Sequence, residues 1–177
     1  MPDPREAAYA LVMQIASADD SALPAVLADA LSPGAVYDMT HPVDRLPGRD
    51  AIVEGFYRPM RRSFAALRRR DEIVIGGRNR RAAGGMWLAT LGHHVGTFRE
   101  PFLGIPPSGR LVFLRSGEFY RVEAGGIVEA KVIVDLVDLM RQAGCCPQPA
   151  MLGAEMLFPA PATHDGVLPP YRERGAA

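Results

Sequence analysis

The sequence predicts an α+β domain in which helices come first and a meander of antiparallel strands follows. Apolar residues recur at helical spacing up to about residue 67, whereas strand-length apolar stretches separated by glycine-rich turns occupy residues 71–134. A sheet that bends around helices forms a cone with one open end. We therefore expect a cone-shaped, strongly curved antiparallel or mixed sheet wrapped around N-terminal helices, with a pocket between the two layers.

Three helical segments are expected in the first part of the chain. Residues 4–16 carry Ala8, Leu11, Val12 and Ile15 on one face. Residues 21–31 form a second helix, which Ser32-Pro33-Gly34 ends. A third begins near Asp50, and its apolar stripe comprises Ile52, Phe56, Met60, Phe64 and Leu67. Pro59 lies inside this stripe, so we expect a kink or break near Arg58.

The strands are expected mainly in the second half. A short strand at residues 35–40 precedes a loop, and the sheet then runs through residues 71–76, 82–95, 110–122 and 127–134. The turn at Glu123-Ala124-Gly125-Gly126 has glycines where a positive φ is easily reached. A final helix ends at Gly144, which is typical of a helix C-terminus.

Bulk composition narrows the class of protein. The chain has 177 residues, 48% of them hydrophobic, and a formal net charge of zero, so it has no overall attraction to nucleic acid or to an anionic membrane. No apolar run approaches the ~20 residues of a membrane span, and no secretory signal is evident. We expect a cytoplasmic protein. Its adjacent cysteines, Cys145 and Cys146, are expected to be free thiols.

The composition also suggests a boundary near residue 146. Residues 147–177 are rich in proline, which excludes a central strand or a long helix. This segment nevertheless carries apolar residues that need covering. We therefore expect one domain, residues 1–146, and a C-terminal arm, residues 147–177, that packs on the domain or on a dimer partner; a loose terminus is the alternative.

Three motifs between residues 94 and 144 resemble those of the SnoaL-like polyketide cyclases, a branch of the nuclear transport factor two-like (cystatin-like) folds. They are His-x-Gly-x-Phe at 94–98, Gly-Ile-Pro-Pro-Ser-Gly-Arg at 104–110, and an acid, Asp135, followed by Leu-Met-x-Gln-x-Gly at 139–144. The resemblance implies a hydrophobic pocket, no cofactor and a homodimer. It also implies that Asp135 is the proton acceptor and that His94 holds a substrate oxygen.

Strand periodicity leaves the environment of Asp135 open. Glu129, Lys131, Ile133 and Asp135 share one face of their strand, and either face can line a cavity. In an apolar cavity the carboxylate would be a base for a carbon acid beside a carbonyl. The alternative is that Asp135 caps the helix that comes after it.

The sequence departs from the resemblance just before this acid. Many members of the family carry Glu-His-Trp there, whereas this chain has Glu129-Ala130-Lys131. Lys131 is an alternative proton donor or amine nucleophile, and an ion pair with Glu129 or Glu118 is the plainer interpretation. Without the histidine, a ring-closing aldol reaction is less strongly implied.

Further polar residues are candidates for binding the substrate. Arg115 and Glu118 lie on opposite faces of their strand, and an Asp–Arg pair at Asp135 would resemble epoxide hydrolases of the same fold; a purely structural pairing of Arg115 is the alternative. Four residues with an apolar body and a polar tip suit a flat or ring-shaped ligand: Tyr37, His41, Trp87 and Tyr120.

Residues 58–81 contain nine arginines, but no nucleic-acid motif accompanies them and the helical stripe leaves most on an outer, solvated face. No set of His, Cys and acidic residues has metal-ligand spacing. The sequence thus favours a cofactor-free acid/base enzyme that removes a proton next to a carbonyl of a small apolar, polyketide-like or cyclic molecule. The alternatives are an isomerase, dehydratase or epoxide hydrolase of this fold, or a non-catalytic binding protein.

Overall fold

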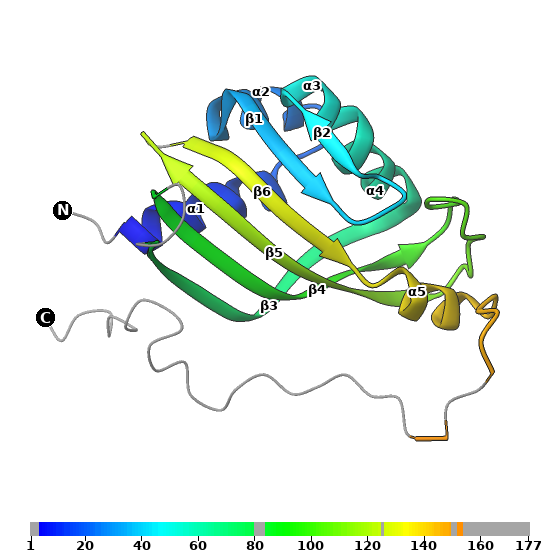
Figure 1. Cartoon of the computed structure of the whole chain (residues 1–177). Helices are drawn as coiled ribbons and strands as arrows, with labels where there is room; N and C mark the ends of the chain where they lie inside the picture. The colour runs from blue at the N-terminus through cyan, green and yellow to red at the C-terminus, as the bar shows by residue number, and fades with distance from the viewer. Residues whose placement is uncertain (1–3, 80–83, 125, 150–151, 154–177) are drawn as a thin grey trace, which may run out of the picture.

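The computed structural model describes residues 4–79, 84–124, 126–149 and 152–153 (Figure 1). Helices α1 (Pro4–Ser17) and α2 (Leu23–Ala30) precede the first strand, and a second helical stretch separates the first two strands from the last four. The remaining elements, in order, are β1 (Leu31–Met39), β2 (Arg45–Pro47), α3 (Arg49–Ile52), the π-helical turn η1 (Val53–Tyr57), α4 (Arg58–Ser63), β3 (Phe64–Arg78), β4 (Met86–Phe98), β5 (Leu111–Glu123), β6 (Gly126–Val134) and α5 (Leu136–Ala143).

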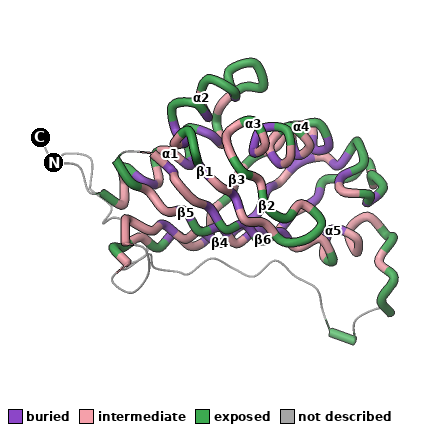
Figure 2. Tube along the Cα trace, turned by 45° about the horizontal axis from the view of Figure 1, so that its top comes forward, coloured by how far each residue is buried: buried purple, intermediate pink, exposed green. Residues whose placement is uncertain are grey.

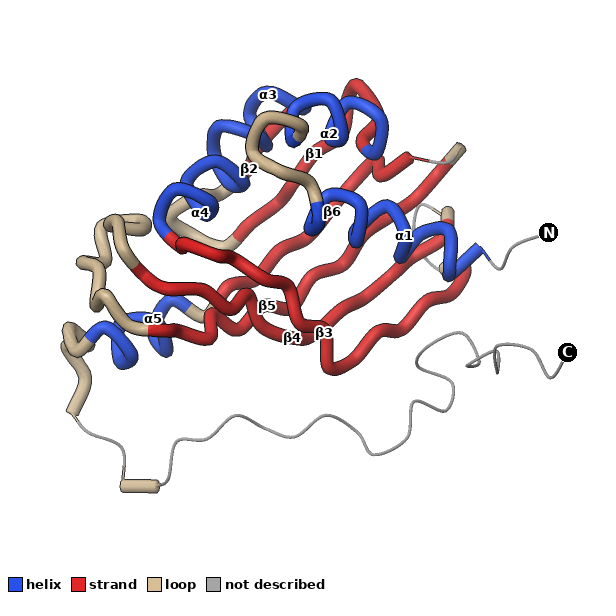
Figure 3. Tube along the Cα trace, turned by 180° about the vertical axis from the view of Figure 1, so that it is seen from behind, coloured by secondary structure: helices blue, strands red, loops and turns tan. Residues whose placement is uncertain are grey.

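The six strands form one curved sheet in the order β2-β1-β6-β5-β4-β3. Strands β3 to β6 make an antiparallel meander, whereas β1 runs parallel to β6. Helices α1 to α4 lie on one side of the sheet, as Figure 3 shows from behind. The predicted α+β architecture, a mixed curved sheet around N-terminal helices, is confirmed.

The helical stretch at residues 49–63 is irregular near the expected place but does not break. The π turn η1 comes directly before α4, which carries Pro59 in its first turn, and Tyr57 and Arg58 at the junction keep helical dihedral angles. The helix ends earlier than the apolar stripe predicts, however, because β3 begins at Phe64 rather than at residue 71. Phe64 is buried from this strand and stacks on Phe98 with ring centroids 4.9 Å apart. A period that matches a helix cannot distinguish this short overlap from the start of a strand.

The hydrophobic core lies between the helices and the inner face of the sheet (Figure 2). Along β6, Ala130, Val132 and Val134 are buried, whereas Lys131 and Ile133 are exposed. The predicted division of β6 into two faces is therefore confirmed, and the face that carries Ala130 is the inner one.

The C-terminal arm predicted for residues 147–177 falls largely outside the described residues. Cys145 and Cys146 are free thiols. Within the described residues, none of the helices has the length and apolar character that crossing a membrane requires.

The tightest backbone approach in the sheet is at Gly92 of β4. A Cβ there would lie 2.1 Å from the Arg70 carbonyl oxygen and 2.8 Å from the Asp71 Cα. We expect Gly92→Ala to destabilise the protein by about 2 kcal/mol or more, because backbone rather than a flexible side chain must move. The control is Gly117→Ala on β5, where the nearest atom is 3.9 Å away. Urea unfolding of both variants measures the difference, and equal stabilities would contradict it.

Candidate active site

A cavity of about 770 Å³ opens between the helices and the inner face of the sheet. Its walls come from the end of α1, the α1–α2 loop, α4 and the first residues of β3. Apolar and polar residues share this wall. Its apolar part includes Val12, Ile15, Met60, Phe64 and Leu67. The polar side chains that line the cavity from the sheet and from η1 are those of Arg68, Arg69, His94, Tyr120 and Tyr57, and those from α1, the α1–α2 loop and α4 are Ser17, Asp19, Asp20, Ser21 and Arg61.

Strand register brings the polar groups together. Arg69 on β3 pairs with His94 on β4, and Thr90 on β4 pairs with Glu118 on β5. Because side chains alternate along a strand, His94 and Thr90 both point inward. His93 points the other way, where its Nδ1 lies 3.1 Å from Glu72.

Glu118 is the centre of this cluster. It is 1% exposed, and its carboxylate lies 2.6 Å from Arg69 Nη1 and 2.8 Å from His94 Nε2. The Tyr120 hydroxyl donates a further, short hydrogen bond. Burial alone would raise the pKa of Glu118, but the Arg69 charge and the hydrogen bonds from His94 and Tyr120 outweigh it and hold the pKa well below its ordinary value. Glu118 is therefore a carboxylate at neutral pH.

Arg69 connects this carboxylate to a second one. Its Nε donates to Asp71 at 2.9 Å and its Nη2 to Thr90 Oγ1 at 2.7 Å, while the Tyr9 hydroxyl donates to Asp71 at 3.0 Å. Burial lowers the pKa of Arg69, but the charge of Glu118 outweighs this and raises it well above its usual value. The guanidinium is thus a permanent charge held between two acids.

The bond between His94 and Glu118 determines the tautomer of the imidazole. An ionised carboxylate only accepts hydrogen bonds, so a neutral His94 must carry its proton on Nε2. Nδ1 then has a free lone pair, and His94 lines the cavity while Glu118 lies behind it. This arrangement can take a proton from a bound molecule and return it.

Ala130, which stands where many members of the family have a histidine, affects the packing on the same inner face of the sheet. Ala130 pairs with Tyr37 on β1 and with Tyr120 on β5, so it lies between two tyrosines. Their rings meet edge-on across it, with centroids 6.3 Å apart. An imidazole at this position would occupy the space where the rings meet.

The structure brings three of the predicted residues together and separates the others. His94 and Tyr120 line the cavity, and Tyr37 is fully buried directly behind Tyr57. Trp87 is far along β4, where its indole donates to the Gly84 carbonyl.

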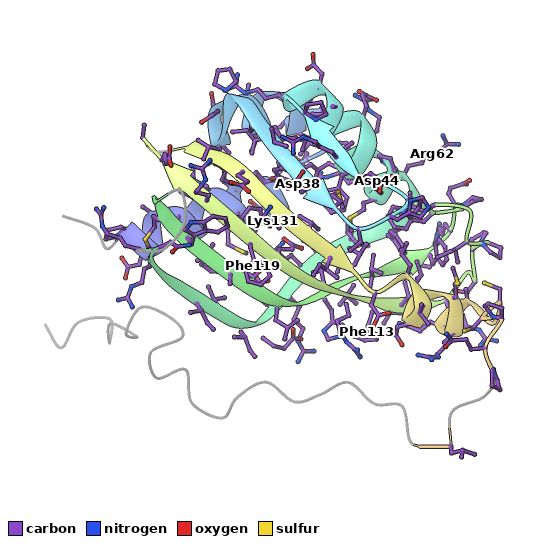
Figure 4. The ribbon with its side chains drawn as sticks, in the orientation of Figure 1. Asp38, Asp44, Arg62, Phe113, Phe119 and Lys131 are labelled. Carbon is purple, nitrogen blue, oxygen red and sulfur yellow. The ribbon has the colours of Figure 1, made fainter. Side chains whose placement is uncertain are left out.

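His41 and Lys131 are at the surface. The His41 side chain is 85% exposed beside Asp44. Lys131 projects from the outer face of β6 and pairs with Asp38 and Glu129 (Figure 4). The ion pair considered as the plainer interpretation of Lys131 is what the structure contains.

Asp135 is outside the cavity lining. Its Oδ1 accepts from the Asp138 N–H at 2.9 Å, which is the N-cap of α5, and its Oδ2 lies 3.4 Å from Arg115. Its side chain is 34% exposed. The capping alternative therefore describes its position, and the acid that contacts the lining residue His94 is Glu118 instead.

Sequence reasoning missed Arg69 and gave Glu118 no role. Arg69 belongs to the arginine-rich stretch that we expected to be solvated, yet its side chain is 7% exposed. The available signal was the strand pattern itself, since Glu118 and Tyr120 lie two residues apart on β5 and share the inner face. In the portion of the chain that the structure describes, no group of His, Cys and acids could hold a metal ion.

The fold is that of the nuclear transport factor two-like class. The family model for SnoaL-like polyketide cyclases matches residues 10–143. The chain belongs to this family.

Solved structures agree with this fold. A SnoaL-like protein from Jannaschia sp. CCS1 has a TM-score of 0.65 at 20% identity, covering 84% of this chain and 99% of its own. IdmH from Streptomyces antibioticus, provisionally assigned as a polyketide cyclase, has a TM-score of 0.63 at 22% identity, with 77% and 98% covered. TsrD from Streptomyces laurentii has 0.63 at 21%, with 82% and 99% covered. A search of curated proteins gave no match.

Glu118→Gln tests the central ion pair. Removing the charge leaves Arg69 buried with only one acid, so we expect a loss of about 3 kcal/mol in urea unfolding at neutral pH. The folded-state pKa of Glu118 is below the ordinary value of 4.5, so its contribution is present above that pH and is lost as pH falls further. The variant should therefore lose less stability than the wild type on acidification.

Glu129→Gln is the matched control on the next strand. Its carboxylate pairs with Arg121 and Lys131 at the surface, where such pairs contribute less than about 1 kcal/mol. A Glu118→Gln variant no less stable than Glu129→Gln would contradict the assignment of Glu118 as the centre of the cluster.

Asp135 offers a second comparison. We expect Asp135→Ala to lose about 1 kcal/mol, because the cap of α5 is removed, and Asp135→Asn to remain near the wild type, because asparagine also caps helices. Thermal unfolding of both variants distinguishes these outcomes. Equal losses would show that the carboxylate matters for something other than the cap.

Proposed function

We propose that this protein is a cofactor-free acid/base enzyme that removes a proton next to a carbonyl of a small, ring-bearing, polyketide-like molecule. The observation that supports the proposal is the His94–Glu118 pair at the wall of a cavity with both apolar and polar lining residues. IdmH, one of the similar structures, carries an assignment as a polyketide cyclase. His94 takes the role of proton acceptor, which the resemblance had given to Asp135.

The proposed step begins with the free lone pair on His94 Nδ1. Nδ1 takes the proton from the carbon, and the electron pair of the C–H bond moves into the carbonyl group to give an enolate. Two carboxylates and one guanidinium give the cluster of Asp71, Arg69 and Glu118 a formal charge of −1. The proton on His94 brings the total to zero, so the transfer leaves no uncompensated positive charge in a buried place.

Ring closure would complete such a reaction. The enolate carbon bonds to a second carbonyl carbon of the same molecule, and the new alkoxide takes the proton back from His94. The protein supplies orientation, because the cavity holds both carbonyls near one imidazole. The net reaction needs no oxidant, reductant or further proton.

Two features of the site favour proton removal by His94 over the addition of water to an epoxide. Addition of water to an epoxide needs a carboxylate that faces the water, and neither acid of the cluster, Glu118 or Asp71, lines the cavity. The carboxylates that do line it, Asp19 and Asp20, belong to the exposed α1–α2 loop, where Asp20 pairs with Arg61. The pKa of Glu118 is also held low, which makes that carboxylate a weak base. The imidazole is the proton acceptor that the inner face of the sheet presents to the cavity.

The test is exchange of carbon-bound hydrogen with solvent deuterium in a panel of cyclic monoketones, whose uncatalysed exchange in neutral water is slow, measured by mass spectrometry. We expect His94→Gln to lower the exchange rate by roughly 10²–10⁴-fold, the range typical of a lost general base. His41→Gln is the matched control, because that histidine is exposed at the surface.

The outcomes separate the remaining candidates. Exchange that depends on Asp135 and not on His94 would restore the acid of the family motif as the base. Binding of the ketones without exchange above the uncatalysed rate in the wild type would identify a non-catalytic binding protein. Either result would refute the proposed role of His94.

A further inference from the structure

Two tyrosine hydroxyls meet beside the cavity and take no part in the His94–Glu118 pair. Tyr37 Oη lies 3.1 Å from Tyr57 Oη, and their rings are edge-on with centroids 6.2 Å apart. Tyr37 is fully buried, whereas Tyr57 is only partly buried and lines the cavity. The pair therefore has one member enclosed in the core and one in contact with whatever the cavity binds.

Hydrogen-bond accounting fixes the direction of the bond. Each hydroxyl has one hydrogen, and only one of the two can lie between the oxygens. If Tyr57 donated, the hydrogen of Tyr37 would lack an acceptor among the described residues while fully buried, at a cost of about 1–3 kcal/mol. Tyr37 is therefore the donor. The hydrogen of Tyr57 is left over, next to the cavity.

The backbone explains why Tyr57 reaches the cavity. It is the last residue of the π turn η1, which adds an extra residue to the helix and rotates the residues after it. Its neighbour Phe56 is buried in the core, with ring centroids 5.0 Å apart. The ring is thus held from behind by Tyr37 and from the side by Phe56, so the hydroxyl has a defined position.

Position 130 makes this arrangement possible. Tyr37 reaches Tyr57 from β1 while its ring also rests against Tyr120 across the small side chain of Ala130. A larger residue there would displace Tyr37. The histidine that the family motif has at this position is absent, and a pair of tyrosines occupies the region instead.

We propose that the Tyr57 hydroxyl binds the substrate oxygen on which negative charge develops, and that Tyr37 is the residue that positions it. This inference rests on the proposed function and adds the ligand class: a molecule with a carbonyl whose ionised form is an enolate or a phenolate. A hydrogen bond to an ionised oxygen is about twice as strong as one to a neutral oxygen, so Tyr57 stabilises the enolate more than the ketone.

Equilibrium binding of two matched probes tests the proposal. 4-Nitrophenolate carries an ionised oxygen on an aromatic ring, and nitrobenzene is the same ring without it. At a pH at which 4-nitrophenol is ionised, we expect the wild type to prefer the phenolate. Tyr57→Phe should lower phenolate affinity by about tenfold or more, and Tyr37→Phe by about threefold. Neither variant should change the affinity for nitrobenzene, because the cavity volume is nearly unchanged.

The ratio of the two affinities distinguishes positioning from general damage. A variant that is merely less well packed loses both probes together, which would overturn the inference, as would a Tyr57→Phe variant that keeps the full preference. A wild type that shows no preference, or binds neither probe, would also overturn it. If a variant does not fold, a pH titration of the visible absorbance of 4-nitrophenol bound to the wild type replaces it. The inference requires bound 4-nitrophenol to ionise at a lower pH than free 4-nitrophenol.

This experiment is independent of turnover. A wild type that prefers the phenolate but catalyses no deuterium exchange would refute the proposed function and leave Tyr57 as a binding residue for ionised oxygens. Exchange that survives while the preference is absent would refute only the role of Tyr57.

Discussion

The buried ion pair between Arg69 and Glu118 is the interaction on which the site depends. Neither charge could be inside the protein alone, because desolvating an isolated ion costs several kcal/mol. Each is paired, and the surplus carboxylate oxygens and guanidinium hydrogens are used by His94, Tyr120, Thr90 and Asp71. The pair links β3 to β5 across β4. The polar part of the cavity wall therefore comes from three neighbouring strands that one ion pair joins.

The cluster also explains which ring nitrogen of His94 carries the proton. A histidine in an apolar wall could present either nitrogen, but a permanent carboxylate behind it leaves one proton arrangement when it is neutral. The tyrosines contribute the complementary polarity. Tyr120 donates to the same carboxylate, whereas the hydrogen of Tyr57 is directed to the cavity by the buried Tyr37. The sheet thus supplies a proton acceptor, His94, and the helical layer a hydrogen-bond donor, Tyr57, to the same cavity.

The order of elements could be predicted because it depends on local patterns. Helical spacing located α1 and α2, Pro59 located the irregular helical turn before α4, and the alternation along β6 separated Ala130 from Lys131. The same logic failed at Phe64, where a helix-like spacing continues into β3. It also left the place of Asp135 open, which the structure puts at the N-terminus of α5 and outside the cavity lining, since a motif position does not say which side of the sheet a strand end reaches. An N-cap and a catalytic acid have the same sequence signature there.

The sequence by itself determined the fold family and one member of the site, His94, because motif spacing and period-two alternation are properties of a single strand. Tertiary structure alone decided that His94 meets Glu118, that Arg69 leaves an arginine-rich surface stretch for the interior, and that two tyrosines from β1 and η1 share a hydrogen bond. These contacts join residues 20 to 49 positions apart. Strand register and sheet curvature set such distances, and neither is encoded in the identity of the residues that meet.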